Sequence, residues 1–289
     1  MRFSDRRKVF RRVLDSNRCV HPGSVFDPIS ARIAEDLGFE IGMFAGSIAS
    51  FTVLGAPDLI VLTLTEFAQQ AQRINRAASI PLMVDADHGY GNALNVRRTV
   101  EELEMAGVSG MSIEDTVLPQ PYNSQGRTKL LSVEEGVGKM KAALDGRTDP
   151  NLVIAGRTSA AAVSGLEDAI ERALAYEKVG IDAIFFVGIK SRKELDEIAT
   201  KIRIPIILGG VGDASMLDLE YLGSRNVRIC LQGHHPFSAA VEAVYSTLKA
   251  LREGVPATDL KGIASTELMQ KVTRGGEYNQ MAREFLEDR

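Results

Sequence analysis

The feature that most limits the fold of this chain is a repeated alternation of short apolar runs with longer segments of helical periodicity. Eight runs of strand length are each followed by a helical pattern within about 230 residues. Such alternation predicts parallel strands, because the connection between two parallel strands is usually a helix. Eight units fit one closed (β/α)8 barrel of the TIM type better than a doubly wound sheet. We therefore predict a single α/β barrel domain over residues 1–289.

The expected elements are separated by glycine, proline and capping residues. Thr63 with Glu66, and Ser132 with Glu135, have the spacing of capping boxes at helix starts. We expect strands at 23–27, 41–45, 81–85, 109–113, 152–155, 183–187, 205–208 and 227–231. We expect helices at 4–14, 28–37, 65–78, 94–105, 132–144, 166–178, 191–202, 214–222 and 237–252. A C-terminal helical extension is expected over about 256–289, and such tails often serve subunit contacts.

The composition is that of a globular protein. Hydrophobic residues make up 45% of the chain and the net charge is -4, so there is no basic stripe for nucleic acid. The apolar runs are far shorter than a membrane span, and residues 1–12 are too charged for a secretory signal. Cys19 and Cys230 are expected to be reduced packing residues. We expect a cytoplasmic protein that binds neither nucleic acid nor membranes.

The densest group of polar residues follows the third expected strand. Asp85 ends that strand, and Asp87 and His88 follow it among glycines. In a continuing strand, residues two apart point the same way, so both carboxylates can share one hard cation directly or through its waters. The alternative is that Asp87 caps the next helix and Asp85 binds loop amides.

The other strand ends carry polar residues as well. These are Asp27, Gly46 with Ser47, Glu114 with Asp115, Arg157, and Gly233 with His234 and His235. In a barrel, functional groups collect just after the strands, on the face that carries the strand-to-helix loops. Helix capping explains one or two such residues, but not acids, an arginine and histidines at five strand ends. The sequence therefore predicts a site at this face.

Three of these residues form an all-oxygen set together with Asp58. Asp85, Asp87 and Glu114 lie at expected strand ends, and Asp58 is expected to reach in from the long second loop. Oxygen ligands without a Cys/His cluster favour Mg2+ or Mn2+ over Zn2+. The alternative is a set of buried structural carboxylates.

The remaining candidates have two interpretations each. Arg157 follows a buried strand, so it must meet a carboxylate of the protein or of a ligand. The turn at Gly46 and Ser47 offers backbone N–H groups to an oxyanion or is only a turn. His234 donates a hydrogen bond or proton to a substrate, or is structural. The polar stretch 116–131 is a mobile lid or a plain surface excursion.

With these residues the chain resembles the isocitrate lyase and phosphoenolpyruvate mutase superfamily over nearly its whole length. The motifs that carry the resemblance are Ser24–Asp27, Gly46–Ser47, Asp85–Gly91, Ser112–Asp115 and Gly156–Thr158. Within the superfamily, Asp85–Val96 and Gly233–His234 are most similar to the bacterial oxaloacetate decarboxylase branch.

The resemblance implies a fold, a reaction and roles for residues. It implies Mg2+-dependent decarboxylation of oxaloacetate to pyruvate and CO2 through a metal-stabilised enolate. Asp85 would be the central metal carboxylate, and Asp58, Asp87 and Glu114 would hold metal-bound waters. Gly46, Ser47, Arg157 and His234 would contact a small 2-oxo-acid substrate. The resemblance also implies a homotetramer whose C-terminal helices are exchanged between neighbours.

Departures from the family pattern keep alternatives open. The stretch 116–131 has no cysteine, which argues against isocitrate or methylisocitrate cleavage. Asn123–Ser124 resembles the pair in the mutase lid, so carbon–phosphorus chemistry of the phosphonopyruvate hydrolase or phosphoenolpyruvate mutase type is an alternative. Val211 stands where the decarboxylase branch usually has tyrosine, and Ser159 where an acid or amide is common. A non-catalytic protein that binds an oxo acid is a further alternative.

Overall fold

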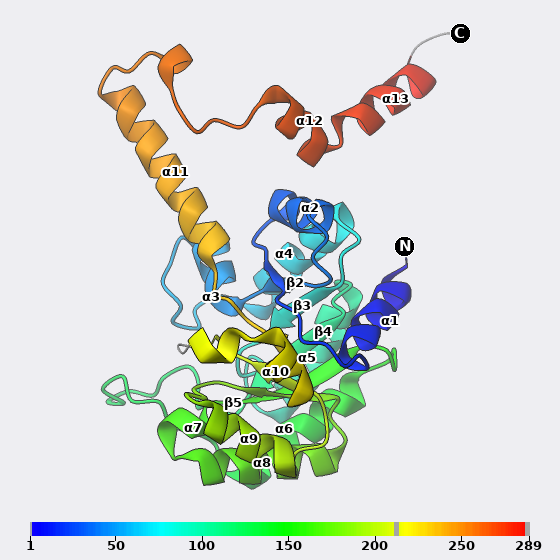
Figure 1. The fold of residues 1–289 in the computed structure, drawn as a ribbon, viewed down its shortest axis with the longest axis vertical. Coiled ribbons are helices and arrows are strands. Elements are labelled where there is room, and N and C mark those ends of the chain that lie inside the picture. Colours follow the sequence, from blue (N-terminus) through cyan, green and yellow to red (C-terminus); the bar gives the residue numbers. More distant parts are fainter. Residues whose placement is uncertain (1, 211–213, 287–289) are drawn as a thin grey trace. The chain divides into compact units, whose positions relative to one another are not determined.

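Eight parallel strands lie side by side in chain order in the computed structural model, which describes residues 2–210 and 214–286 (Figure 1). They are β1 (Gly23–Ser24), β2 (Gly42–Phe44), β3 (Leu82–Asp85), β4 (Gly110–Glu114), β5 (Val153–Thr158), β6 (Ala183–Phe186), β7 (Ile206–Leu208) and β8 (Val227–Cys230). Val20, which precedes β1, forms a parallel bridge with Ile229 of β8. The sheet therefore closes on itself, and the predicted (β/α)8 barrel is confirmed.

Helices connect successive strands, and one further helix, α1, precedes the first strand. The main ones are α1 (Phe3–Leu14), α2 (Pro28–Asp36), α4 (Leu64–Ala77), α5 (Ala93–Met105), α6 (Val133–Gly146), α8 (Leu166–Val179), α9 (Arg192–Lys201) and α10 (Leu219–Ser224). Shorter ones are α3 (Gly46–Ala49), the π-helix η1 (Ser50–Leu54), α7 (Ala160–Val163) and the 3-10 helix η2 (Ala214–Leu217). The strands are buried almost throughout, so their apolar side chains form the core.

Capping residues start the helices largely where the sequence indicated. Thr63 and Glu66 form the predicted capping box of α4. The Ser132 hydroxyl accepts a hydrogen bond from the Glu135 backbone N–H at 3.1 Å at the start of α6. Asn92, not Asp87, caps α5, so the capping interpretation of Asp87 is wrong. Asp87 is therefore available for another role.

The barrel differs from the expected elements in several places: β1 ends at Ser24, and the short helix α7 was not expected. The helix expected at 214–222 is divided into η2 and α10, because the Asp218 carboxylate accepts hydrogen bonds from the N–H groups of Glu220 and Tyr221 and starts a new helix. The long second loop, in which no helix was expected, contains α3 and η1.

The contacts divide the chain into two compact units, Met1–His234 and His235–Arg289. The second unit contains α11 (His235–Arg252), the 3-10 helix η3 (Ala257–Asp259), α12 (Thr266–Thr273) and α13 (Gly275–Phe285). The helix expected at 237–252 thus exists, but it belongs to the second unit together with the extension expected over 256–289. No helix in the described part of the chain is both long and apolar enough to cross a membrane.

Candidate active site

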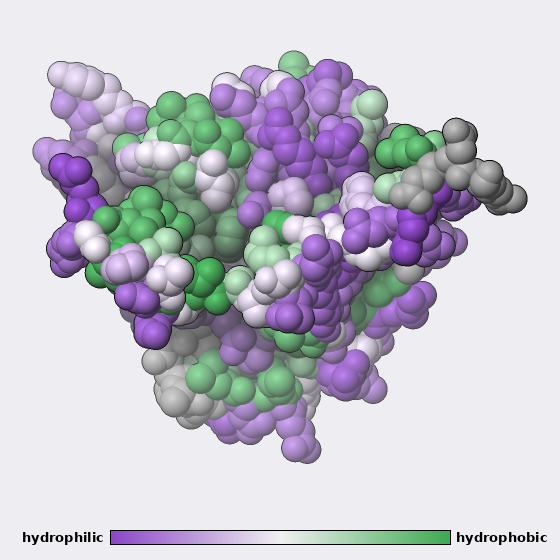
Figure 2. All heavy atoms as spheres, turned by 90° about the horizontal axis from the view of Figure 1, so that it is seen from above, coloured by the Kyte–Doolittle hydropathy of each residue, from purple (hydrophilic) through white to green (hydrophobic). Residues whose placement is uncertain are grey.

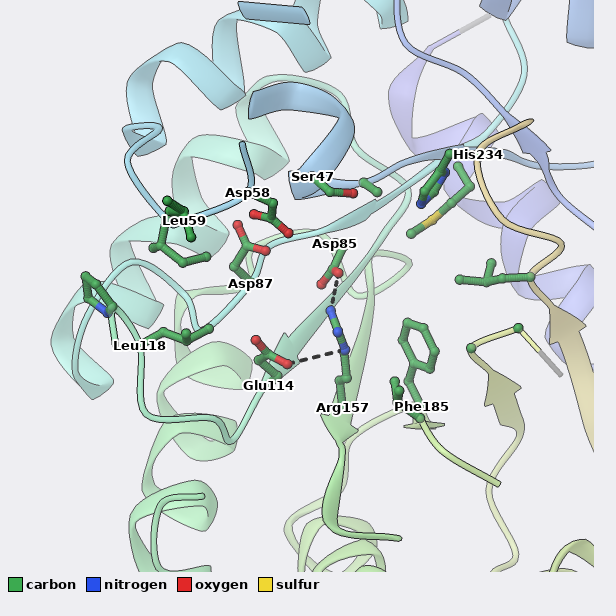
Figure 3. Close-up of a pocket in the computed structure, with 18 of the residues that line it drawn as sticks. Ser47, Asp58, Leu59, Asp85, Asp87, Glu114, Leu118, Arg157, Phe185 and His234 are labelled. Carbon is green, nitrogen blue, oxygen red and sulfur yellow. Dashed lines mark hydrogen bonds and ion pairs between the residues drawn. The ribbon is translucent and has the colours of Figure 1, made fainter. Parts of the chain in front are cut away.

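A cavity of about 590 Å³ lies at the carboxyl ends of the barrel strands (Figure 3). It belongs entirely to the first unit. The predicted site residues among those that line it are Ser47, Asp58, Asp85, Asp87, Glu114, Arg157 and His234. The structure therefore brings together, from five different strand ends and one loop, side chains that are far apart in the sequence.

Asp85 and Arg157 form an ion pair inside this cavity. Asp85 ends β3 and Arg157 lies in β5. The second oxygen of Asp85 accepts a hydrogen bond from the Ser112 hydroxyl at 3.0 Å. The Arg157 Nε atom lies 3.4 Å from a carboxylate oxygen of Glu114, and its guanidinium carbon lies 5.5 Å from the centre of the Phe185 ring. Arg157 thus meets carboxylates of the protein, which was one of its two interpretations.

The turn after β3 holds Asp87 in an uncommon backbone conformation, with a φ of 48°. The Glu114 N–H donates to the Asp87 carbonyl at 2.8 Å, and the buried Lys139 ammonium donates to the His88 carbonyl at 2.7 Å. Glu114 belongs to β4 and Lys139 to α6, so these two elements hold the turn in place through its backbone carbonyls. The Asp87 backbone is therefore held in place by neighbouring elements, and it sets the direction of the carboxylate.

Gly46 makes room for the Asp87 carboxylate. A Cβ atom at position 46 would lie 2.5 Å from either carboxylate oxygen of Asp87, which is closer than real Cβ contacts come. Gly46 is not among the described residues that line the cavity, so the substrate contact expected of it stays a prediction. The structure gives it a different part: its missing side chain lets Asp87 approach.

The negative charges of the carboxylates in the cavity are only partly balanced by nearby positive charge. Burial raises the pKa of Asp87 well above its usual value, and the charges of Asp85, Asp58 and Glu114 raise it further against the opposing effect of Arg157. Burial and then the charge of Asp85 also raise the pKa of Asp58. Burial raises the pKa of Glu114 although Arg157 lowers it. Among the described lining residues, Arg157 is the only lysine or arginine.

This donor set fits a hydrated, hard divalent cation. Carboxylate oxygens are the ligands that Mg2+ prefers, and the added positive charge would relieve the repulsion among the acids. Within residues 2–210 and 214–286, no group of three or more His, Cys, Asp or Glu side chains is arranged to hold a metal by itself. Mg2+ usually keeps several waters and takes only one or two protein carboxylates, so the site does not need such a group.

Ser47 and His234 face the same cavity from the ends of β2 and β8 (Figure 3). Ser47 is the second residue of the short helix α3. The His234 Nδ1 atom lies 2.9 Å from the Ser24 hydroxyl oxygen, at the end of β1. The sequence motif contained Ser24 but did not indicate this contact, which joins the first and last strands across the closure of the barrel.

Four other polar residues at strand ends do not reach the cavity. Asp27 caps α2, accepting from the Ser30 N–H at 2.7 Å. Asp115 is fully buried and turned toward α8, and His88 is buried behind the turn after β3. His235 begins α11 in the second unit. None of these four is among the described residues that line the cavity, and Asp27 is a helix cap of the kind that the sequence analysis allowed for.

The sequence analysis also missed the apolar part of the cavity wall. The apolar lining residues include Met43, Phe185, Val187 and Leu231. These residues look like ordinary core residues in the sequence, and only strand alternation could have indicated which of them point inward. Leu118, Pro119 and Gln120 of the stretch 116–131 line the cavity as well, so this stretch is not a plain surface excursion. Ser159 lines a smaller adjoining cavity of about 200 Å³, and Val211 lies outside the described residues.

Comparison with known families and proteins gives consistent matches over nearly the whole chain. The family model described as phosphoenolpyruvate phosphomutase matches residues 10–252. An oxaloacetate decarboxylase of Bradyrhizobium diazoefficiens is 58% identical over 277 residues, 96% of each chain. An oxaloacetate decarboxylase of Rhodopseudomonas palustris is 55% identical over 286 residues, 99% of each chain.

Solved structures share the fold at lower identity. A phosphoenolpyruvate phosphomutase from Streptomyces platensis subsp. rosaceus matches with a TM-score of 0.86 and 26% identity, covering 97% of this chain and 99% of its own. A phosphonopyruvate hydrolase in complex with oxalate and Mg2+ matches with a TM-score of 0.85 and 27% identity, covering 99% of each chain.

Proposed function

The chain belongs to the phosphoenolpyruvate mutase and isocitrate lyase superfamily, and from this membership we propose that its cavity decarboxylates oxaloacetate to pyruvate and CO2. The observation that carries the proposal is the crowding of four carboxylates around one arginine in a single cavity, which suits a divalent cation and a small anionic substrate. The curated relatives at 55–58% identity named oxaloacetate decarboxylase support the same reaction.

We propose that Mg2+, or Mn2+, is the cofactor, with Asp85 as the central carboxylate and Asp58, Asp87 and Glu114 holding metal-bound waters. The bound cation would supply Lewis-acid polarisation of the 2-oxo oxygen. Carboxylates that are fixed by the fold would fix the positions of the metal-bound waters. Only the remaining positions on the cation would then be open to the substrate. The likeness to a phosphonopyruvate hydrolase complex with oxalate and Mg2+ supports this assignment.

The side chains of the protein position the substrate and stabilise charge. When the bond between C3 and C4 breaks, CO2 leaves and the electron pair moves onto the C2 oxygen as an enolate. Ser47 lines the cavity, and its hydroxyl and the adjacent backbone N–H groups would donate to that oxygen. Arg157 binds the C1 carboxylate, and His234, oriented by Ser24, delivers the proton that C3 needs to form pyruvate.

The apolar wall suits the group that leaves. Oxaloacetate carries a second carboxylate at C4, and Arg157 is already shared between two protein acids. We propose that the C4 carboxylate lies against the apolar side chains of Val187 and Leu231, because Arg157, the only lysine or arginine among the described lining residues, binds the C1 carboxylate. An apolar surface solvates a charged carboxylate poorly, but neutral CO2 loses little by lying against it. The bound substrate is therefore destabilised relative to the product, which favours loss of CO2.

Carbon–phosphorus chemistry is less well supported by the cavity. That alternative requires Asn123 or Ser124 to close onto the substrate, and neither is among the described residues that line the cavity. Asn123 is exposed in the outer part of the loop. Asn123→Ala is therefore expected to leave turnover unchanged, whereas loss of turnover would favour the alternative.

The test is pyruvate release from oxaloacetate with Mg2+ and with EDTA, corrected for spontaneous decarboxylation. We expect release that depends on the metal and falls about 100-fold or more in Asp85→Asn. Asp182→Asn is a matched control, because the Asp182 side chain is 14% exposed and pairs with Arg147, while that of Asp85 is 12% exposed and pairs with Arg157. No release above background in the wild type would exclude the decarboxylase, and binding of oxalate without turnover would indicate a binding protein.

We also propose that the protein is a homotetramer in which C-terminal helices are exchanged between neighbours. The described residues of α11 and α13 include none that is buried, and Val244, Tyr245 and Leu248 of α11 are exposed. Figure 2 shows hydrophobic side chains gathered at the surface among hydrophilic ones. Exposed apolar surface of this kind is normally covered by another subunit. Light scattering after gel filtration should give four times the mass of 31.4 kDa, and a monomer would contradict the proposal.

A further inference from the structure

The loop from Thr116 to Leu131 has a short two-stranded stem. Thr116 and Leu130 form an antiparallel bridge, and the Val117 N–H donates to the Lys129 carbonyl at 2.8 Å. The Leu131 N–H donates to the Asp115 carbonyl at 2.8 Å. The two ends of the loop therefore leave the barrel side by side, and the stem sets the direction of everything between them.

One arginine of α8 holds both ends of this stem. The Arg172 Nη1 atom donates to the Asp115 carboxylate at 3.1 Å, where the loop begins, and to the Leu131 carbonyl at 2.9 Å, where it ends. The Tyr176 hydroxyl, one turn further along α8, donates to the same Asp115 oxygen at 2.8 Å. Asp115 and Tyr176 are fully buried and Arg172 nearly so, so these are charge-assisted bonds away from water.

Arg172 and Tyr176, the α8 residues that contact the stem, have further contacts that hold them in place. The Arg172 Nε atom donates to the Asp168 carboxylate at 3.0 Å on the preceding turn of α8. The Tyr176 hydroxyl packs against α6 at Gly136, where a Cβ atom would lie 2.1 Å from it. Neither Arg172 nor Tyr176 lines the described cavity, and so neither is needed there for chemistry.

The loop reaches the cavity in two ways. Beyond the stem, Leu118, Pro119 and Gln120 line it, and within the stem Thr116 lines the smaller adjoining cavity together with Glu114. We infer that Arg172 and Tyr176, acting through Asp115, are positioning residues that hold this loop over the cavity. The effect on catalysis rests on the proposed decarboxylase function, but the effect on the loop does not.

Limited digestion with trypsin tests the loop directly. Arg127 and Lys129 are exposed cleavage sites in the loop. Without the guanidinium the stem opens more often, and cleavage of a transiently open segment follows its open population. Cleavage after these two residues, measured by mass spectrometry in the full chain, should be about tenfold faster or more in Arg172→Leu. Tyr176→Phe, which removes only one donor to Asp115, should give a smaller increase.

Arg7→Leu is the matched control for a general loss of stability. Arg7 is as buried as Arg172 and also donates to a carboxylate, that of Asp149, and to backbone carbonyls, but it joins α1 to the rest of the barrel. It should lower the Tm without increasing cleavage in the loop. Equal acceleration in both arginine variants, or none in Arg172→Leu, would overturn the inference.

Kinetics separate positioning from folding. If the loop is open part of the time, substrate binding must first close it, so KM for oxaloacetate rises in inverse proportion to the closed fraction while kcat at saturation changes little. If Arg172 only stabilises the fold, the amount of active enzyme falls and KM stays the same. We expect the first pattern, and the second would overturn the inference. An inactive wild type would refute the decarboxylase and leave the digestion result as the test of the loop.

Discussion

Asp85 and Arg157 form an ion pair within the cavity although their strands, β3 and β5, are separated by β4. Ser112 lies on the intervening strand β4, and its hydroxyl donates to the Asp85 oxygen that does not pair with Arg157. Both side chains are largely buried, at 12% and 20% exposed. A cation that binds Asp85 must therefore share this carboxylate with Arg157 or displace the guanidinium from it.

This competition predicts opposite effects of Arg157→Gln on metal binding and on turnover. Removing the guanidinium leaves Asp85 and Glu114 unpaired, so Mg2+ should bind about tenfold more tightly, while kcat/KM falls about 100-fold because the substrate carboxylate loses its partner. The rise in Tm with MgCl2 concentration measures the binding. Arg147→Gln, which removes a similar pair with Asp182, should leave the Mg2+ response as in the wild type. An unchanged Mg2+ response in Arg157→Gln would rule out the competition.

Gly46→Ala is expected to displace the Asp87 carboxylate, which lies against Gly46. The added Cβ would lie 2.5 Å from the Asp87 carboxylate oxygens, so that side chain must move. We expect kcat/KM to fall about 10- to 100-fold, because a shift of about 1 Å at a positioned group costs this much. Gly138→Ala in α6 is the control, since nothing lies within 4 Å of a Cβ there, and it should raise stability by up to about 1 kcal/mol. Wild-type activity in Gly46→Ala would show that the position of Asp87 is unimportant.

Ser24→Ala is expected to remove one contact that orients His234. The Ser24 hydroxyl is 2.9 Å from His234 Nδ1 and fixes the orientation of the ring. If His234 protonates the enolate, its loss of orientation should lower kcat about tenfold, with a smaller change in KM. Ser24→Thr keeps the hydroxyl and should retain most of the activity. Equal loss in both variants would point to packing at the end of β1 rather than to the hydrogen bond.

Much of the fold could be predicted from the sequence because each strand is a local signal. The apolar runs at β3 to β6 are nearly fully buried, and the turns that bound them contain glycine, proline and capping residues. What a local pattern could not indicate is which elements pack together. The helix α11 has a clear helical sequence, but its place in the second unit depends on contacts that no window of sequence contains.

Within the site, Glu114 and Asp115 show what could not be predicted from the sequence. The two acids are adjacent at the end of β4, yet Glu114 lines the cavity and Asp115 turns away to Tyr176 and Arg172. Strand alternation separates neighbouring residues onto opposite faces, but the sequence does not say which face is which. Asp87 shows the converse, because a turn with positive φ, rather than strand alternation, brings it beside Asp85.

A pH dependence of stability is predicted for Asp149, at the opposite end of the barrel from the cavity. Burial alone would raise the pKa of this carboxyl, but hydrogen bonds from the Asn151 N–H and the Arg7 guanidinium outweigh it and lower the pKa to about 2. An unfolded aspartate has a pKa of about 3.9. The stabilisation is therefore complete above about pH 4 and is lost as the pH falls toward 2.

Asp149→Asn should accordingly lower the free energy of unfolding by about 1–2 kcal/mol at pH 7 and at pH 5, and by clearly less at pH 3. The quantity to measure is the difference between wild type and variant in urea midpoint across this range. Asp145→Asn is the control, because the Asp145 side chain is 71% exposed and pairs with Arg97 only at the surface, so it should change little at any pH. A difference for Asp149→Asn that is the same at pH 3 as at pH 7 would mean that the charge of Asp149 does not stabilise the fold. The contribution would then come from the hydrogen bonds, since asparagine replaces one acceptor oxygen of Asp149 by an NH2 donor, which cannot accept from either Asn151 or Arg7.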